Sequence, residues 1–160
     1  MEFKKGKIEG VVIEKLIKFS DERGFLVETF RVDNLPDDLQ PAMSHISYTK
    51  PGVARGPHKH NKQTDIFCFL GPGNFKIKLW DNREESKTYG NYMEFFGGRE
   101  NPLRVIIPFG VVHGYKNISK NVIGMVINYP DKLYRGCGKK GSVDEKRYEN
   151  DKQSPFNMDD

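Results

Sequence analysis

Short extended segments dominate the pattern of apolar and polar positions along this chain. Residues 75–79 alternate strictly between apolar side chains and lysine, which is the period of a strand with one buried face. The other segments are rich in β-branched and aromatic residues and are bounded by Gly, Pro, Asn and Asp, as strands are. We therefore predict strands over residues 11–17, 25–30, 44–49, 65–70, 74–80, 104–107, 111–117 and 122–129.

Turn signals separate these segments, and helical patterns are nearly absent. The turns are expected at residues 21–24, 51–52, 71–73, 81–82 and 97–98, and one helical turn is expected within 33–39. Many short strands without intervening helices predict an all-β protein, an antiparallel sandwich or barrel of the jelly-roll type. The length suits one domain over residues 1–160, with a polar tail from about residue 135 that covers a sheet edge or a neighbouring subunit.

Charge and composition narrow the function classes. The net charge is +4, but the lysines are spread among acids, which argues against a nucleic-acid surface and suits an anionic small molecule such as a nucleotide diphosphate. No apolar run reaches membrane-spanning length, so we expect no membrane-spanning segment. No apolar segment follows the basic N-terminus, so we expect no signal peptide. Cys68 lies in an apolar run and is expected to be an inert buried thiol. We expect a cytoplasmic protein.

Three of the four histidines fall in two short stretches, residues 52–65 and 108–117. His58 and His60 are two apart, so on a strand they point to the same side. Asp65 begins the next apolar strand, and His113 lies in a separate one. If these strands line one barrel, three imidazoles and a carboxylate converge. The two stretches resemble the two motifs of a cupin β-barrel.

Two chemistries fit such a site. His58, His60, Asp65 and His113 would supply three nitrogen ligands and one oxygen ligand to a divalent transition metal. Alternatively, a neutral imidazole would deprotonate a carbon next to a ketone without any metal.

Metal-free proton chemistry also needs an acid on the opposite face of the substrate. Tyr129 and Tyr134 follow a barrel strand and are candidates, and Tyr115 beside His113 is another. His45 occupies the polar phase of its strand, where it is either a further site residue or a surface residue.

Four segments follow in order that are more specific than the histidine pattern. They are Asp-Glu-Arg-Gly-Phe at 21–25 followed by Glu28, Val-Ala-Arg-Gly-Pro-His at 53–58, the Asp-x-Arg-x-x-Ser-x-Thr-x-Gly stretch at 81–90, and Ile-Pro-Phe-Gly-Val-Val-His-Gly at 107–114. Over about residues 8–134 the chain resembles the dTDP-4-dehydrorhamnose 3,5-epimerase family. This resemblance implies a jelly-roll homodimer that needs no cofactor and epimerises a 4-keto-6-deoxy sugar linked to thymidine diphosphate.

The resemblance also implies roles for individual residues. His58 matches the catalytic base, Arg55 a basic residue near the diphosphate, and His113 a second pocket histidine. Arg23 and Glu28 match residues that contact the nucleotide, across a dimer interface.

The chain differs from the family at four places, one of which is the residue pair after the base histidine, Lys59-His60 in this chain. Asp65 stands where the family has a lysine, and Asn128 stands where it has the catalytic tyrosine. The aspartate that polarises the base belongs to a C-terminal extension that this shorter chain lacks. Asp65 would then orient His58 or His60 in its place.

Three interpretations follow, and we weigh them in this order. The first is an isomerase acting on a nucleotide-linked keto sugar, with His58 as base and with His45, His60, Asp65 and His113 around the substrate. The second is a metal-dependent cupin, and the third is a sugar-binding module without catalysis.

Overall fold

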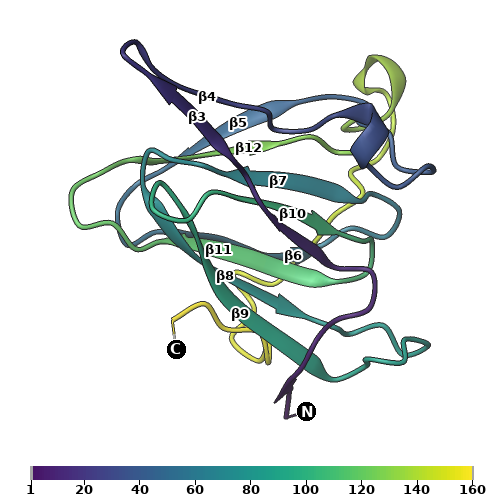
Figure 1. Cartoon of the computed structure of the whole chain (residues 1–160). Helices are drawn as coiled ribbons and strands as arrows, with labels where there is room; N and C mark the ends of the chain where they lie inside the picture. The colour runs from purple at the N-terminus through teal and green to yellow at the C-terminus, as the bar shows by residue number, and fades with distance from the viewer. Residues whose placement is uncertain (1, 160) are drawn as a thin grey trace.

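Two facing β-sheets and a projecting hairpin make up the computed structural model of the chain, which describes residues 2–159 (Figure 1). One sheet has the order β1-β9-β8-β11-β6-β13, the other has the order β2-β10-β7-β12-β5, and β3-β4 form the hairpin. This arrangement confirms the predicted all-β jelly-roll sandwich. Within residues 2–159, no helix is long and apolar enough to cross a bilayer.

The strands are β1 (Lys4–Lys5), β2 (Val12–Lys15), β3 (Lys18–Asp21), β4 (Gly24–Val27), β5 (His45–Thr49), β6 (Ala54–Lys59), β7 (Asp65–Phe69), β8 (Asn74–Trp80), β9 (Asn91–Gly98), β10 (Leu103–Ile107), β11 (Val112–Asn117), β12 (Gly124–Asn128) and β13 (Lys146–Arg147). Two short 3₁₀ turns, η1 (Val32–Asn34) and η2 (Cys137–Lys139), complete the described elements. The helical turn expected within 33–39 is therefore only the 3₁₀ turn η1.

One turn prediction is wrong. Gly97 and Gly98 are the last residues of β9, where they pair with β8. A Cβ on Gly98 would lie 2.4 Å from the carbonyl oxygen of Gly73, and the residue has φ +145°. The glycine is needed because two strands approach closely there.

The inner faces of the two sheets form the main core. Along β7, Phe67 and Phe69 point inward with Asp65, because side chains alternate along a strand. Phe75 and Tyr115 meet Phe69 from the opposite sheet with ring centroids 5.7 and 5.5 Å apart. One part of the barrel is thus filled by aromatic rings, and the polar side chain of Asp65 lies beyond them.

The outer face of β7 is covered as well, which explains its uninterrupted apolar sequence. Ile66 packs with Leu35 and Leu39 from the segment that follows η1. Cys68 is buried on the same face, and burial raises the pKa of its thiol to about 12. A thiol with this pKa stays protonated and inert at neutral pH, as the sequence indicated.

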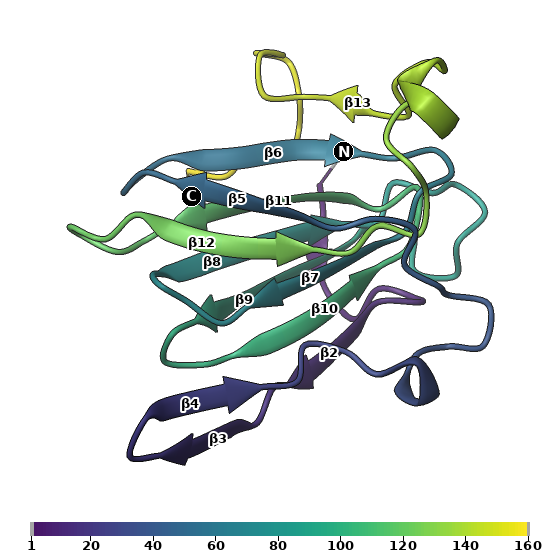
Figure 2. The same cartoon turned by 90° about the horizontal axis from the view of Figure 1, so that it is seen from above.

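The C-terminal tail returns along the six-stranded sheet (Figure 2). Strand β13 pairs with the edge strand β6. Beyond it, Phe156 and Met158 pack with Trp80 and Val112 on the outer face of that sheet. The tail therefore covers a sheet edge, which is one of the two placements expected for it.

The stretch at 81–88 folds as a loop around one carboxylate. Asp81 is fully buried and accepts hydrogen bonds from Arg83 Nε at 2.8 Å, Ser86 Oγ at 2.6 Å and Thr88 Oγ1 at 2.6 Å. Burial alone would raise the pKa of Asp81, but these hydrogen bonds outweigh it and lower the pKa to about 2. The spacing of this motif is thus explained by a structural loop.

Replacing Asp81 with alanine is expected to lower the free energy of unfolding by about 3 kcal/mol, because three half-buried donors lose their buried acceptor together. Urea unfolding measures the change, and Asp38→Ala, at an exposed carboxylate, is the control. Because the pKa is lowered on folding, the contribution of Asp81 is present above about pH 4 and is lost as the pH falls towards 2. A loss no larger than that of the control would contradict this account of the loop.

Candidate functional site

Three histidines meet at the polar part of the barrel and form the histidine cluster (His58, His60 and His113). His58 on β6 pairs directly with His113 on β11, and their ring centroids are 4.4 Å apart. His60 follows the end of β6, with its ring 5.4 Å from that of His58. One ring nitrogen from each residue lies within 4.8 Å of the others. The strands thus bring the three imidazoles together as expected.

A bulge between β6 and β11 shapes this part of the barrel. The pairing register shifts between His113 and Tyr115. Opposite the shift, Gly56 has φ +78°, and a Cβ there would lie 2.6 Å from the carbonyl oxygen of His113. The Arg-Gly-Pro-His stretch therefore needs its glycine so that the two histidine-bearing strands can approach.

Asp65 lies beside the cluster and is only 1% exposed. Its Oδ1 accepts hydrogen bonds from Gln63 Nε2 at 2.9 Å and Asn128 Nδ2 at 2.8 Å. Its Oδ2 faces His60 Nε2 at 3.3 Å and His113 Nε2 at 3.4 Å. Burial alone would raise the pKa of Asp65, but the contacts with His113, His60 and Asn128 outweigh it and lower the pKa to about 2. The carboxylate is therefore ionised at neutral pH.

The carboxylate near His58 is Glu145, which the sequence analysis did not identify. Glu145 Oε1 lies 3.8 Å from His58 Nε2, and both side chains are largely buried. Burial, followed by the neighbouring His113 and His60, lowers the pKa of His58 to about 2, so its imidazole is the free base at neutral pH. Glu145 of the tail thus lies near His58 while its Oε2 accepts a hydrogen bond from Arg147 Nε at 2.9 Å, whereas Asp65 faces the other two histidines.

The residue before Glu145 fastens the tail to the cluster. The carboxylate of Asp144 accepts backbone N–H bonds from Asn61, Lys62 and Gln63. The carbonyl oxygen of Asp144 contacts His60 Nδ1. The segment 144–145 is therefore part of the site.

Two exposed polar residues, His45 on β5 and Arg55 on β6, lie beside the cluster. His45 is exposed and pairs with Asn128 on the neighbouring strand β12. Burial lowers the pKa of the His45 imidazole, and the Asp65 carboxylate opposes this shift. Arg55 on β6 is exposed and reaches across to Thr49, with Nε 2.9 Å from Oγ1. His45 and Arg55 are thus the exposed polar groups at the border of the site.

The two tyrosines predicted as acids do not join the cluster. Tyr129 follows Asn128, so it points to the outer face of its sheet, where it packs with Phe30 and bonds Thr29 Oγ1 at 2.9 Å. Tyr134 is 51% exposed and lies beyond the strand. Tyr115 is on the inner face, with its hydroxyl 2.7 Å from Ser47 Oγ. Of the three tyrosines considered, only Tyr115 lies inside the barrel.

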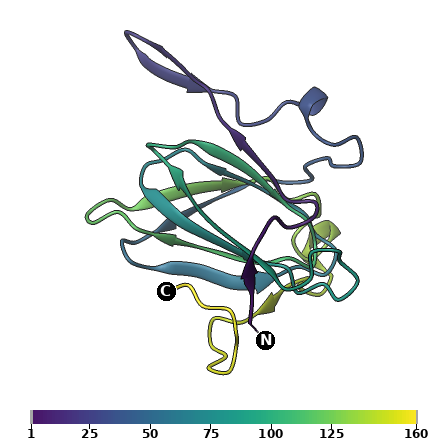
Figure 3. The ribbon, with the colours of Figure 1, turned by 60° about the horizontal axis from the view of Figure 1, so that its bottom comes forward.

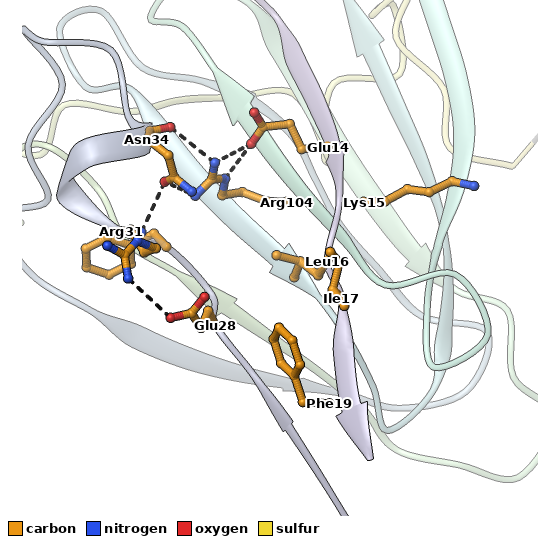
Figure 4. Close-up of a pocket in the computed structure, with 10 residues that line it drawn as sticks. Glu14, Lys15, Leu16, Ile17, Phe19, Glu28, Arg31, Asn34 and Arg104 are labelled. Atoms are coloured by element: carbon orange, nitrogen blue, oxygen red, sulfur yellow. Dashed lines mark hydrogen bonds and ion pairs between the residues drawn. The ribbon is translucent and has the colours of Figure 1, made fainter.

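Arg23 and Glu28 also lie apart from the cluster. Arg23 is at the turn of the hairpin arm (residues 18–27), which stands away from the sandwich (Figure 3). Glu28 pairs with Arg31 at 3.5 Å beside a hollow of about 280 Å³. Figure 4 shows that hollow between Glu28 on one side and Phe19 and Glu14 on the other. Within one chain, neither predicted nucleotide contact reaches the histidines.

The chemistry available at the site follows from its groups. His58 is a largely buried imidazole with Nε2 3.8 Å from a carboxylate, which would stabilise the imidazolium that forms when the ring accepts a proton. His60, His113 and Asp65 offer two nitrogens and one oxygen, a donor set suited to transition metals.

Comparisons with known proteins agree with this architecture. The family dTDP-4-dehydrorhamnose 3,5-epimerase matches residues 5–135. The spore coat polysaccharide biosynthesis protein SpsL of Bacillus subtilis is 39% identical over 120 residues, which cover 74% of this chain and 78% of that protein. The probable low-salt glycan biosynthesis epimerase Agl13 of Haloferax volcanii is 38% identical over 128 residues, covering 79% and 81% of the two chains.

Solved structures share the fold. A dTDP sugar isomerase from Desulfovibrio desulfuricans superposes with a TM-score of 0.80 at 25% identity, covering 94% of this chain and 91% of that one. An epimerase from Legionella pneumophila, solved in complex with dTDP-4-keto-L-rhamnose, has a TM-score of 0.74 at 21% identity and covers 91% and 76%. Together with the family match, these similarities show that the chain belongs to the dTDP-4-dehydrorhamnose 3,5-epimerase family and is a sugar epimerase of that type.

Proposed function

We propose that this chain epimerises the sugar of a nucleotide-diphosphate-linked 4-keto-6-deoxyhexose, with His58 as the base. The observation that carries the proposal is the environment of His58: a largely buried imidazole with Glu145 3.8 Å from Nε2 and, within residues 2–159, no hydrogen-bond partner at Nδ1. The family match and the sugar nucleotide bound to the Legionella relative support the substrate class.

The reaction follows from the acidity of a carbon next to a ketone. When His58 removes the proton from that carbon, the bonding electrons pass to the ketone oxygen and form an enolate. The new imidazolium is stabilised by the nearby carboxylate of Glu145. A proton delivered from solvent water to the opposite face of the carbon inverts it, and His58 then releases its proton to solvent; the same two steps serve either carbon beside the ketone.

The hairpin arm supports a homodimer as part of the proposal. Phe19, Phe25 and Leu26 are each more than half exposed, and among the strands of residues 2–159, β3 and β4 pair only with each other. A two-stranded hairpin with exposed apolar residues is marginal in water, so we expect the arm to pack on a second copy of the chain. In such a dimer Arg23 and Glu28 would reach the partner's nucleotide, while Arg55 would face the diphosphate. A cytoplasmic location, where nucleotide sugars are used, belongs to the same proposal.

Solvent-deuterium exchange tests the reaction. The chain is incubated in D₂O with dTDP-4-keto-6-deoxyglucose, with an enzyme-free sample as control, and the sugar is analysed by mass spectrometry and NMR. Deuterium at both carbons beside the ketone is expected for a 3,5-epimerase. Exchange at one carbon would correct the reaction to a single epimerisation, and no exchange above the control would refute the proposal.

Replacing Glu145 with glutamine is expected to lower kcat by about 10- to 100-fold with little change in KM. The amide keeps the size of the side chain but cannot stabilise an imidazolium, so the effect falls on the transition state. Steady-state kinetics measure it, and Glu149→Gln, at an exposed carboxylate of the same tail, is the matched control. Equal kcat values for the two variants would show that Glu145 has no part in the reaction.

A further inference from the structure

His45 occupies an inward-facing position of β5. Two residues later on the same strand, Ser47 Oγ lies 2.7 Å from the hydroxyl of Tyr115 inside the barrel. Side chains two apart on a strand share a face, so His45 points the same way as Ser47. His45 is nevertheless exposed, and it is the first residue of β5. It therefore lies at the border of the site, where both solvent and an entering sugar can reach it.

A cross-strand pair places His45 beside the histidine cluster. His45 pairs with Asn128 on β12, and Asn128 Nδ2 donates a hydrogen bond to Asp65 Oδ1 at 2.8 Å. Directly paired residues of antiparallel strands have Cβ atoms about 4.5–5.5 Å apart on the same face. One side chain thus separates His45 from the carboxylate that faces His60 and His113.

His45 and the proposed base belong to facing sheets. His58 is on β6 of the six-stranded sheet, whereas His45 is on β5 of the five-stranded sheet. A sugar ring held between the two sheets would present one face to His58 and the other face to His45. Inversion of a carbon needs this arrangement, because the proton leaves from one face and a proton returns to the other.

The neighbouring polar side chains are poorer proton donors. Asp65 has a pKa of about 2, so it is ionised at neutral pH. The amide of Asn128 has no acidic proton. The Tyr115 ring is buried in the main core, and burial raises the pKa of its hydroxyl. An imidazole, by contrast, takes up and releases a proton near neutral pH.

We propose that His45 is the acid that delivers the solvent-derived proton to the opposite face of the sugar carbon. This assignment rests on the proposed function, in which His58 forms the enolate. The imidazolium of His45 gives its proton to the carbon. The electron pair of the enolate double bond forms the new carbon–hydrogen bond, and the oxygen electrons restore the ketone. His45 then takes up a proton from solvent, which its exposure allows, and His58 releases its proton to solvent.

The surroundings of His45 predict how inversion depends on pH. Burial is the largest cause of its lowered pKa; the Asp65 carboxylate opposes the shift, and Arg55 and His60 add to it. The imidazolium of His45 is therefore the minor form above about pH 6.5. Its share falls about tenfold with each further pH unit, so inversion should slow between about pH 7 and 9.

Replacing His45 with glutamine in the full-length chain tests the assignment. Glutamine stays polar but supplies no acidic proton. After incubation with dTDP-4-keto-6-deoxyglucose in D₂O, NMR measures both the inverted sugar and the deuterium in the uninverted sugar. Inversion is expected to fall by at least about 100-fold. Exchange into the uninverted sugar is expected to stay within about tenfold, because His58 still forms the enolate and returns deuterium to the same face. Tyr48→Phe removes an exposed hydroxyl from the same strand, and this control should change neither quantity.

Chemical rescue separates proton donation from a structural role. His45→Ala removes an exposed side chain, so imidazole from solution can enter the space. Added imidazole should raise the inversion rate of this variant by at least about tenfold, and it should leave that of Tyr48→Phe unchanged. Circular dichroism and dTDP binding by calorimetry confirm that each variant is folded.

The outcomes distinguish this inference from the proposed function. A His45→Gln variant that inverts the sugar at the full rate would exclude His45 as the acid but leave His58 as the base. Equal loss of exchange and inversion, without rescue by imidazole, would show that His45 holds the sugar and does not protonate it. Exchange without inversion in the unmodified chain would also overturn the assignment, because no acid would then be needed. Absence of both in the unmodified chain would refute the proposed function itself.

Discussion

Replacing His58 with asparagine is expected to reduce deuterium incorporation into the keto sugar by about 1,000-fold. Removing the group that accepts the proton takes away general-base catalysis, which contributes about 100- to 10,000-fold. Asparagine is similar in size to histidine and stays polar, so the barrel should keep its shape. Because His58 would act on both carbons beside the ketone, exchange at the two positions should fall together.

Binding measurements show whether such a loss is specific. The affinity for dTDP, measured by calorimetry, should stay within about threefold of the unmodified chain, because the base meets the sugar and not the nucleotide. The change should therefore appear in kcat and leave KM nearly unaltered. A variant that keeps more than a tenth of the exchange rate would exclude His58 as the base. A variant that loses dTDP binding as well would indicate a collapsed site.

The strands and the histidine cluster were predictable because both depend on local rules. The period of two along a strand placed His58 and His60 on one side, and the strand predicted at 74–80 has the bounds of β8. Strand β9 was missed because its end at Gly97–Gly98 has the composition of a turn. The need for glycine there arises from the neighbouring strand, which the local sequence does not reveal.

Long-range contacts explain what the sequence analysis missed at the site. Glu145 lies in a polar tail with no periodic pattern, and only the pairing of β13 with β6 brings it to His58. Asp65 was expected to orient His58 or His60, and it faces His60 together with His113, a contact that the sequence did not indicate. Tyr129 was predicted as an acid, but neighbouring positions on a strand face opposite sides, and its side chain lies on the outer face of the sheet. Asn128, one residue earlier, is the side chain that meets Asp65.

Replacing Phe19 with aspartate is expected to weaken self-association of the chain by about 1,000-fold. Phe19 is 53% exposed on β3 and lines the hollow beside the arm. Burial of the exposed half of Phe19 contributes about 1 kcal/mol, an aspartate carboxylate in the same interface costs about 1 kcal/mol more, and a symmetric dimer contains the residue twice. A loss of about 4 kcal/mol corresponds to about 1,000-fold in the dissociation constant. Sedimentation velocity over a range of concentrations measures the shift from dimer to monomer.

Phe96→Asp is the matched control for this effect. Phe96 is 52% exposed on β9, so the same substitution is made at an equally exposed strand position of a different sheet. If the arm joins two copies, only the Phe19 variant should become monomeric, and its KM for the sugar nucleotide should rise because Arg23 and Glu28 no longer reach the partner's site. If both variants remain dimeric, the arm is not the interface. If the Phe19 variant becomes monomeric with an unchanged KM, the arm is the dimer interface of the unmodified chain. In that case Arg23 and Glu28 do not contact the nucleotide across this interface.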